Sequence, residues 1–146
     1  MSTVTSLRPG AVVIESDPSI LAFAANPGLA EVIGAALPQA KIRNGDIRSA
    51  IQLMSRQESA EAVIVEIGDV EAPEGAVKAL RTICKDEVRI LAVGTVNDVA
   101  FYRRLIAAGA DDYLVQPVGN EALVRAVEQF ARPRGGMGEG DRKSVV

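Results

Sequence analysis

Side chains that could take part in chemistry follow the short apolar runs of this sequence. Glu66 stands near the end of the run 62–67, and Gln116 directly follows the run 112–115. If these runs are parallel strands, their carboxyl ends meet along one edge of a sheet, where ligand crevices form. We expect such a crevice to be lined by Ala24, Ala25, Glu66, Gly94 and Gln116. This set carries a single carboxylate, so the predicted crevice is small and weakly charged, and no catalytic residue is assigned to it.

The composition excludes several classes of site. The chain has no histidine, which removes histidine-based metal sites and Ser-His or Cys-His catalysis. The single cysteine, Cys84, cannot form an internal disulfide, fits a reducing cytosol, and is interpreted as a buried helix thiol. With 16 basic and 19 acidic residues, the net charge of -3 gives no electrostatic footprint for nucleic acid. We therefore expect no bound metal, no cofactor and no enzymatic activity.

The N-terminus lacks a basic segment followed by an apolar stretch, so no signal peptide is predicted. No run approaches the roughly 20 apolar residues that a membrane span requires. These features predict a cytoplasmic protein without direct membrane insertion.

Short β-branched runs alternate with helical segments along the chain. Such alternation predicts βαβ units and a parallel sheet that is covered by helices on both faces. Strands are expected at 40–43, 62–67, 89–93 and 112–115. Helices are expected at 47–56 after an Asp46 cap, from Pro73 through Ile83, from an Asn97 or Asp98 cap to Gly109, and from an Asn120 cap to a stop at Pro133.

The first strand has two candidates, at residues 11–15 and 20–25. The first choice would place Pro27 and Gly28 inside the following helix, where they cost about 3 and about 1 kcal/mol relative to alanine. The second choice makes Asn26 the N-cap and Pro27 the first residue of a helix over 27–37. We prefer 20–25, which leaves 11–15 as an extra N-terminal segment or an added edge strand. The predicted organisation is an extension over 1–18, one domain over 19–132 and a flexible Gly-rich tail over 133–146.

The segment Gly109-Ala-Asp-Asp-Tyr-Leu-Val-Gln-Pro-Val118 resembles the last strand and following turn of response-regulator receiver domains, which read close to G-A-D-D-Y-L-x-K-P. The resemblance implies a CheY-like, flavodoxin-like fold: a doubly wound five-stranded parallel sheet of order 2-1-3-4-5 with helices on both faces. It also places Tyr113 where receivers carry an aromatic side chain that turns in or out upon activation.

The resemblance assigns a role to each crevice position. In a receiver, an aspartate ending strand three accepts phosphate, and acidic residues after strand one hold Mg²⁺. A Ser or Thr after strand four and a Lys after strand five contact the phosphoryl group. Here these positions carry Glu66, Ala24 and Ala25, Gly94, and Gln116, while Thr95 comes one residue late. With strand one at 11–15, the acidic positions would instead be Glu15 and Ser16. We therefore expect a receiver-like domain that neither binds Mg²⁺ productively nor takes phosphate.

A narrower resemblance rests on Arg43-Asn-Gly-Asp-Ile-Arg-Ser-Ala-Ile51 and Ile90-Leu-Ala-Val-Gly-Thr-Val-Asn-Asp-Val-Ala-Phe-Tyr-Arg-Arg-Leu105. Both are similar to the N-terminal atypical receiver domain of TadZ/CpaE-type pilus assembly proteins, in which a ParA/MinD-like ATPase domain follows. The resemblance implies a protein-interaction module that forms homodimers and reaches a cell pole by binding pilus or secretion machinery. For the interaction face we propose Tyr102, Arg103, Arg104 and Tyr113, of which Tyr113 could equally be an edge tyrosine that packs on the last helix.

Two other functions remain open at this point. One is a working response-regulator receiver in a two-component phosphorelay that uses Glu15. The other is a flavodoxin-like domain that binds a nucleotide or small ligand, although no Gly-rich loop follows strand one.

Overall fold

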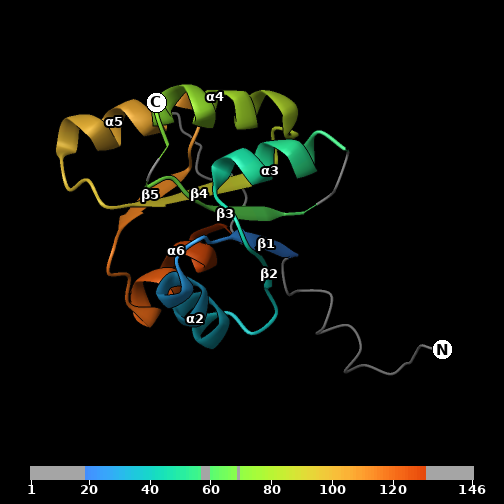
Figure 1. The fold of residues 1–146 in the computed structure, drawn as a ribbon, viewed down its shortest axis with the longest axis vertical. Coiled ribbons are helices and arrows are strands. Elements are labelled where there is room, and N and C mark those ends of the chain that lie inside the picture. Colours follow the sequence, from blue (N-terminus) through green and yellow to red (C-terminus); the bar gives the residue numbers. More distant parts are fainter. Residues whose placement is uncertain (1–18, 57–59, 69, 131–146) are drawn as a thin grey trace, which may run out of the picture.

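A five-stranded parallel sheet of order β2-β1-β3-β4-β5 forms the centre of the molecule (Figure 1). The structure is a computed structural model and describes residues 19–56, 60–68 and 70–130. The strands are β1 (Ile20–Phe23), β2 (Lys41–Arg43), β3 (Ala62–Glu66), β4 (Arg89–Gly94) and β5 (Asp112–Val115). The predicted fold class and strand order are confirmed.

Helices cover both faces of the sheet. They are α2 (Pro27–Ala36), α3 (Ile47–Met54), α4 (Pro73–Ile83), α5 (Val99–Ala108) and α6 (Asn120–Phe130). Figure 1 shows α3, α4 and α5 on one face and α2 with α6 on the other. In the part of the chain that the structure describes, no helix is long and apolar enough to cross a membrane.

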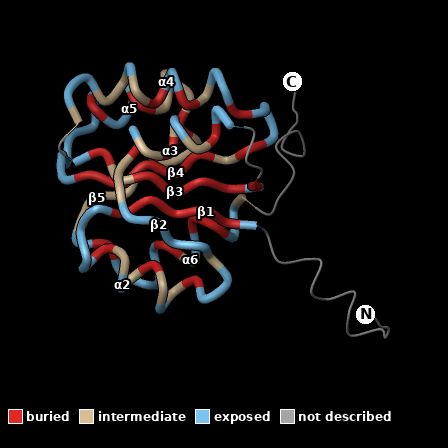
Figure 2. The backbone as a smooth tube through the Cα atoms, turned by 45° about the vertical axis from the view of Figure 1, so that its right-hand side comes forward, coloured by how far each residue is buried: buried red, intermediate tan, exposed pale blue. Residues whose placement is uncertain are grey.

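Successive residues of each central strand pack into two separate cores. Leu21, Val63 and Ile90 belong to the core beneath α3, α4 and α5, whereas Ile64 and Leu91 belong to the core above α2 and α6. Figure 2 shows β1, β3 and β4 buried along their length. This two-sided burial explains why the strands read as continuous apolar runs, since each aliphatic side chain removed from water contributes about 1.5–3 kcal/mol.

The structure decides between the two candidates for the first strand. β1 is Ile20–Phe23, and Asn26 caps α2 by accepting a hydrogen bond from the backbone N–H of Gly28 at 2.8 Å. Pro27 occupies the first turn, where its missing N–H costs nothing. The alternative strand at 11–15 lies outside the described residues, as do the predicted tail and the stop at Pro133.

The other helix starts agree with the sequence apart from one. Asp46 caps α3, and Asp98 rather than Asn97 caps α5 by accepting from the N–H of Phe101. Asn120 was predicted as a cap but is already helical, because the N–H of Leu123 bonds to the carbonyl of Gly119 and starts the ladder one residue earlier. Gly109 ends α5 at a φ of 129°, as its position after the helix predicts.

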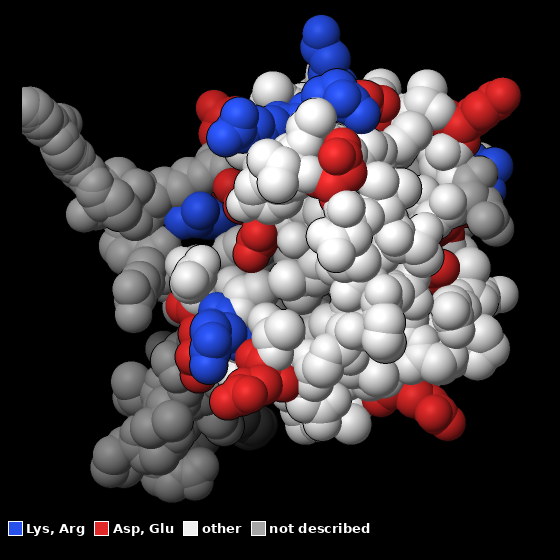
Figure 3. Space-filling view, turned by 90° about the vertical axis from the view of Figure 1, so that its left-hand side faces the viewer, with Lys and Arg blue, Asp and Glu red and all other residues white. Residues whose placement is uncertain are grey.

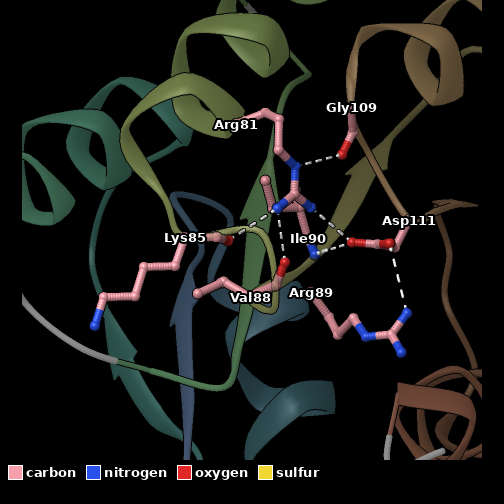
Figure 4. Close-up of polar contacts among 7 residues, drawn as sticks. All are labelled: Arg81, Lys85, Val88, Arg89, Ile90, Gly109 and Asp111. Carbon is pink, nitrogen blue, oxygen red and sulfur yellow. Dashed lines mark hydrogen bonds and ion pairs between the residues drawn. The ribbon is translucent and has the colours of Figure 1, made fainter. Parts of the chain in front are cut away.

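A partly buried arginine, Arg81, joins α4 to β4 and β5 at the amino edge of the sheet (Figure 4). Arg81 donates to the carbonyls of Gly109 and Val88 at 3.1 and 2.9 Å and to the carboxylate of Asp111 at 2.8 Å. The same Asp111 oxygen accepts from the N–H of Ile90, also at 2.8 Å. A Cβ at Gly109 would lie 2.7 Å from the Arg81 side chain, so the arginine can reach this corner only over a glycine. Asp111, the first aspartate of the Gly109-Ala-Asp-Asp motif, thus stabilises the fold. It lies at the amino ends of the strands, opposite the pocket.

Candidate functional site

The carboxyl ends of β1, β3, β4 and β5 surround an open pocket of about 390 Å³. Its lining consists of Ala25, Asn26, Glu66, Gly68, Thr95 and Gln116. Each strand delivers its last residue, or the residues just beyond it, to the same edge, as a parallel sheet requires. The pocket therefore lies where the crevice was predicted.

Glu66 is the last residue of β3, and its carboxylate is already bound within the chain. One oxygen, Oε1, accepts hydrogen bonds from the backbone N–H groups of Ala25 at 2.8 Å and Asn26 at 3.0 Å. Both donors stand at the start of α2, where the helix dipole and free N–H groups favour a negative charge. The carboxylate of Glu66 thus takes the position of an anion on the N-terminus of α2 and ties the end of β3 to the β1–α2 loop.

Asn26 connects this carboxylate to the end of β5. Its side-chain oxygen caps α2, and its Nδ2 donates to Oε1 of Gln116 at 3.4 Å. The Gln116–Pro117 peptide bond is cis. Gln116 therefore brings a neutral amide, which accepts a hydrogen bond from Asn26, to the position where the receiver pattern places a lysine ammonium.

Gly94 ends β4 in contact with the ring of Tyr113. A Cβ at Gly94 would lie 2.8 Å from the tyrosine Oη and 3.1 Å from Cγ1 of Ile67. No side chain larger than hydrogen fits at Gly94 while the ring is in place. Gly94 therefore adds no side chain to the pocket, and the next residue, Thr95, lines it.

Two contacts, one of the hydroxyl and one of the ring, hold the Tyr113 side chain in the interior. Its hydroxyl donates to the carbonyl of Val96 at 2.8 Å, and its ring meets Phe101 edge-on at a centroid distance of 5.5 Å. Burial raises the pKa of this tyrosine above its ordinary value, and the hydrogen bond to Val96 opposes that shift. The ring is only 6% exposed and packs against α5, so it supplies support beneath α5 and does not lie on an exposed face.

The predicted pocket residues divide into two groups. Ala25, Glu66 and Gln116 line the pocket, whereas Ala24 and Gly94 are buried beside it. Sequence reasoning did not place Asn26 and Gly68 in the pocket, and it set Thr95 aside as one residue late. The sequence could have placed Asn26 in the pocket, because a helix cap that directly follows the first strand must lie at the carboxyl edge of the sheet.

The proposed interaction residues also separate. Tyr102 is 40% exposed and Arg103 is exposed, on the outer side of α5. Arg104 instead turns toward α4, where its Nε lies 2.6 Å from Oε2 of Glu74, and its guanidinium lies over the ring of Phe101 at 5.8 Å. All three residues are exposed, but of the two arginines only Arg104 is held by an ion pair within the described chain.

The pocket offers few ligands for a cation. Within residues 19–56, 60–68 and 70–130, no group of three carboxylate, thiol or imidazole side chains lies close enough to hold a metal ion. Ala24 and Ala25 contribute no oxygen from a side chain, and Oε1 of Glu66 is bound by two amides. This donor set does not fit the oxygen-rich shell that Mg²⁺ requires.

Comparison with solved structures places this geometry in a family. A pilus assembly protein CpaE from Caulobacter crescentus is 30% identical over 78% of this chain and 99% of that chain, with a TM-score of 0.69. The chain belongs to the CpaE family of receiver-like domains. A CpaE2 pilus assembly protein from Sinorhizobium meliloti is 28% identical over 77% of this chain and 98% of that chain, with a TM-score of 0.71. The predicted resemblance to CpaE-type domains is confirmed.

This CpaE-family domain shares its fold with receiver domains. A response regulator from Thermotoga maritima has a TM-score of 0.66 over 78% of this chain and 97% of that chain at 16% identity, a likeness that concerns the fold alone. No protein-family model matches the sequence, and no curated protein matches it significantly.

Proposed function

We propose that this CpaE-family domain is a protein-interaction and dimerisation module of a pilus assembly and localisation protein, and that it works without phosphorylation. It acts in the cytoplasm, gathers at a cell pole through its partners, and carries out no reaction and uses no cofactor. The observation that carries the proposal is the Glu66 carboxylate seated on the N–H groups of Ala25 and Asn26.

The chemistry of phosphoryl transfer supports this proposal. A receiver needs a divalent cation and a lysine to neutralise charge on the transferring group. This pocket has Ala25 after β1 and Gln116 after β5, and the group at the acceptor position is a carboxylate that already accepts two N–H bonds. Charge on that carboxylate is balanced by the N-terminus of α2, an interaction that needs neither a metal ion nor a phosphoryl group.

The outer side of α5 supports the role in protein interaction. Val99 and Tyr102 are 65% and 40% exposed, and Arg103 lies next to them on the helix. Exposed aromatic and arginine side chains are the residue types that most often anchor protein interfaces. We propose that this side of α5 contributes to a homodimer interface.

A phosphorelay receiver is the second candidate function, and Thr95 is the observation that favours it. Thr95 lines the pocket and carries the hydroxyl that Gly94 lacks. Phosphotransfer in that case would require a carboxylate at position 66 that leaves the α2 amides and attacks a phosphoryl donor.

Labelling with acetyl [³²P]phosphate separates the two candidates. We expect no label on the native chain or on Glu66→Asp, because the variant restores the acceptor type but neither the metal ligands nor the lysine. Uptake of stoichiometric label by either protein would favour the phosphorelay. A working receiver domain serves as the positive control.

Sedimentation equilibrium tests the interaction role. The double variant Tyr102→Ala/Arg103→Ala should dissociate at concentrations where the native chain is dimeric. Arg125→Ala, on α6, is the matched control because Arg125 is also exposed. An unchanged dimer constant in the double variant would remove α5 from the interface.

A further inference from the structure

The pocket contains a carboxylate oxygen that no group in the described residues uses. Oε2 of Glu66 accepts no hydrogen bond, and no lysine or arginine of the described part of the chain pairs with this carboxylate. Among the described residues Oε1 of Gln116 accepts from Asn26 alone, and Thr95 lines the same pocket. Three residues with side-chain oxygens, Glu66, Thr95 and Gln116, therefore line a space that is open to solvent. Such a site favours a cationic hydrogen-bond donor, above all a guanidinium.

An exposed apolar strip leads from this pocket onto α5. It begins at Val96, the residue after the pocket-lining Thr95, and continues through Val99 to Tyr102. Their exposed fractions are 45%, 65% and 40%, high for large apolar side chains that follow one another on a surface. Figure 3 looks onto the carboxyl edge of the sheet and shows a broad uncharged area at its centre, with the charged side chains around its margins.

A cation stands at the far end of the strip. Arg103 follows Val99 by one helical turn, is exposed, and pairs with no carboxylate of the described chain. It differs in this respect from its neighbour Arg104, which bonds to Glu74 at 2.6 Å. The surface thus carries an acceptor pocket at one end, apolar side chains in the middle and a free guanidinium at the other end.

This order of groups is self-complementary. In a twofold dimer each residue i that contacts residue j of the other copy is matched by the reverse contact. A twofold axis through the apolar strip would place Val96 and Val99 against their own copies. It would also bring the basic end of each strip to the acidic end of the other.

We propose that the pocket of one copy receives Arg103 of a second copy, whose guanidinium pairs with Oε2 of Glu66. The inference deepens the proposed dimer, on which it rests, and gives Glu66 two separate roles. Oε1 holds the β1–α2 loop within the chain, and Oε2 binds the partner. The pocket is then a docking site for a basic side chain in place of a metal or phosphoryl site.

A double-mutant cycle on the dimer dissociation constant tests this pairing. Glu66→Gln keeps an oxygen for the Ala25 and Asn26 amides and removes the charge, so the variant should stay folded, with a small loss of stability because the N-terminus of α2 favours the carboxylate. Arg103→Gln removes the other charge. Each single variant should raise the dimer dissociation constant roughly tenfold or more. The double variant should raise it no further than the single variant with the larger effect, because the two residues share one contact.

Arg125→Gln is the matched control and should leave the constant unchanged. If Glu66→Gln has no effect while Arg103→Gln weakens the dimer, the pocket inference is overturned but the α5 interface stands, and the pocket is left to another protein's basic side chain. Additive effects of the two variants would likewise overturn the pairing. A chain that stays monomeric at every concentration removes both the pairing and the proposed dimer.

Discussion

Replacing Gly94 with alanine tests why this position lacks the side chain that the receiver pattern expects. The added Cβ would lie 2.8 Å from Oη and 3.2 Å from Cε1 of Tyr113 and 3.1 Å from Cγ1 of Ile67. Contacts under 3.0 Å force a movement, and the ring has little freedom, since the carbonyl of Val96 binds its hydroxyl and Phe101 packs edge-on with it.

The cost follows from the two ways in which the protein can respond. If the ring stays, the overpacked core pays about 1–3 kcal/mol. If the ring leaves, the chain loses a hydrogen bond worth about 1 kcal/mol. The loss of the edge-on aromatic pair adds about 0.5–1.5 kcal/mol. Either route predicts a decrease of about 2 kcal/mol in the free energy of unfolding, and a Tm lower by roughly 6–12 °C.

Urea denaturation followed by circular dichroism measures this change. Gly75→Ala is the matched control, because Gly75 lies inside α4 with no atom near its Cβ position, and the substitution should be neutral or stabilising by up to about 1 kcal/mol. In a Tyr113→Phe background the closest contact disappears, so the penalty of Gly94→Ala should fall. A loss below about 0.5 kcal/mol in the native background, or an equal loss in both backgrounds, would refute the argument.

Three further predictions concern the rest of the chain. Arg81→Lys should lower the free energy of unfolding by about 1–3 kcal/mol by urea denaturation, because an ammonium cannot serve Gly109, Val88 and Asp111 together; a neutral result would contradict this. The hydrogen bond from the Arg48 side chain lowers the pKa of Asp46, so its stabilising contribution is present above about pH 4 and is lost as the pH falls through the folded-state pKa. Asp46→Asn should therefore lose less stability than the native chain in acid, and equal losses would count against the assignment. Burial raises the pKa of the Cys84 thiol, so Ellman's reagent should react roughly tenfold or more slowly with the folded than with the urea-unfolded chain.

Most of the fold could be predicted from the sequence because each element carries its own local signal. The run 62–67 is apolar throughout because β3 is buried on both faces, and Asp46 and Asp98 mark helix starts by capping them. The choice of β1 was also decided locally, since Pro27 and Gly28 are costly inside a helix and favourable at its start. Asn120 misled because glycine and asparagine both occur at helix N-caps, and the hydrogen bond from Leu123 to the carbonyl of Gly119 starts the helix after Gly119.

The candidate site could be predicted in position but not in its bonding. The strand ends placed Glu66 and Gln116 at one edge, because a parallel sheet brings carboxyl ends together. The bonds from Ala25 and Asn26 to Glu66 join residues about 40 positions apart and depend on the depth of the β1–α2 loop, for which the sequence has no signal. Thr95 lines the pocket in place of Gly94, because the ring of Tyr113 packs against Gly94. This packing is also a tertiary contact, for which the sequence has no local signal.

Titration of the ¹⁵N-labelled chain with Mg²⁺ and beryllofluoride, a phosphoryl mimic, tests the central claim most directly. If the Glu66 carboxylate is held by the α2 amides and the pocket takes no phosphoryl group, the amide signals of Ala25, Asn26, Glu66 and Thr95 will stay in place at millimolar concentrations of both. Saturable shifts of these signals would contradict the account and establish a working receiver pocket.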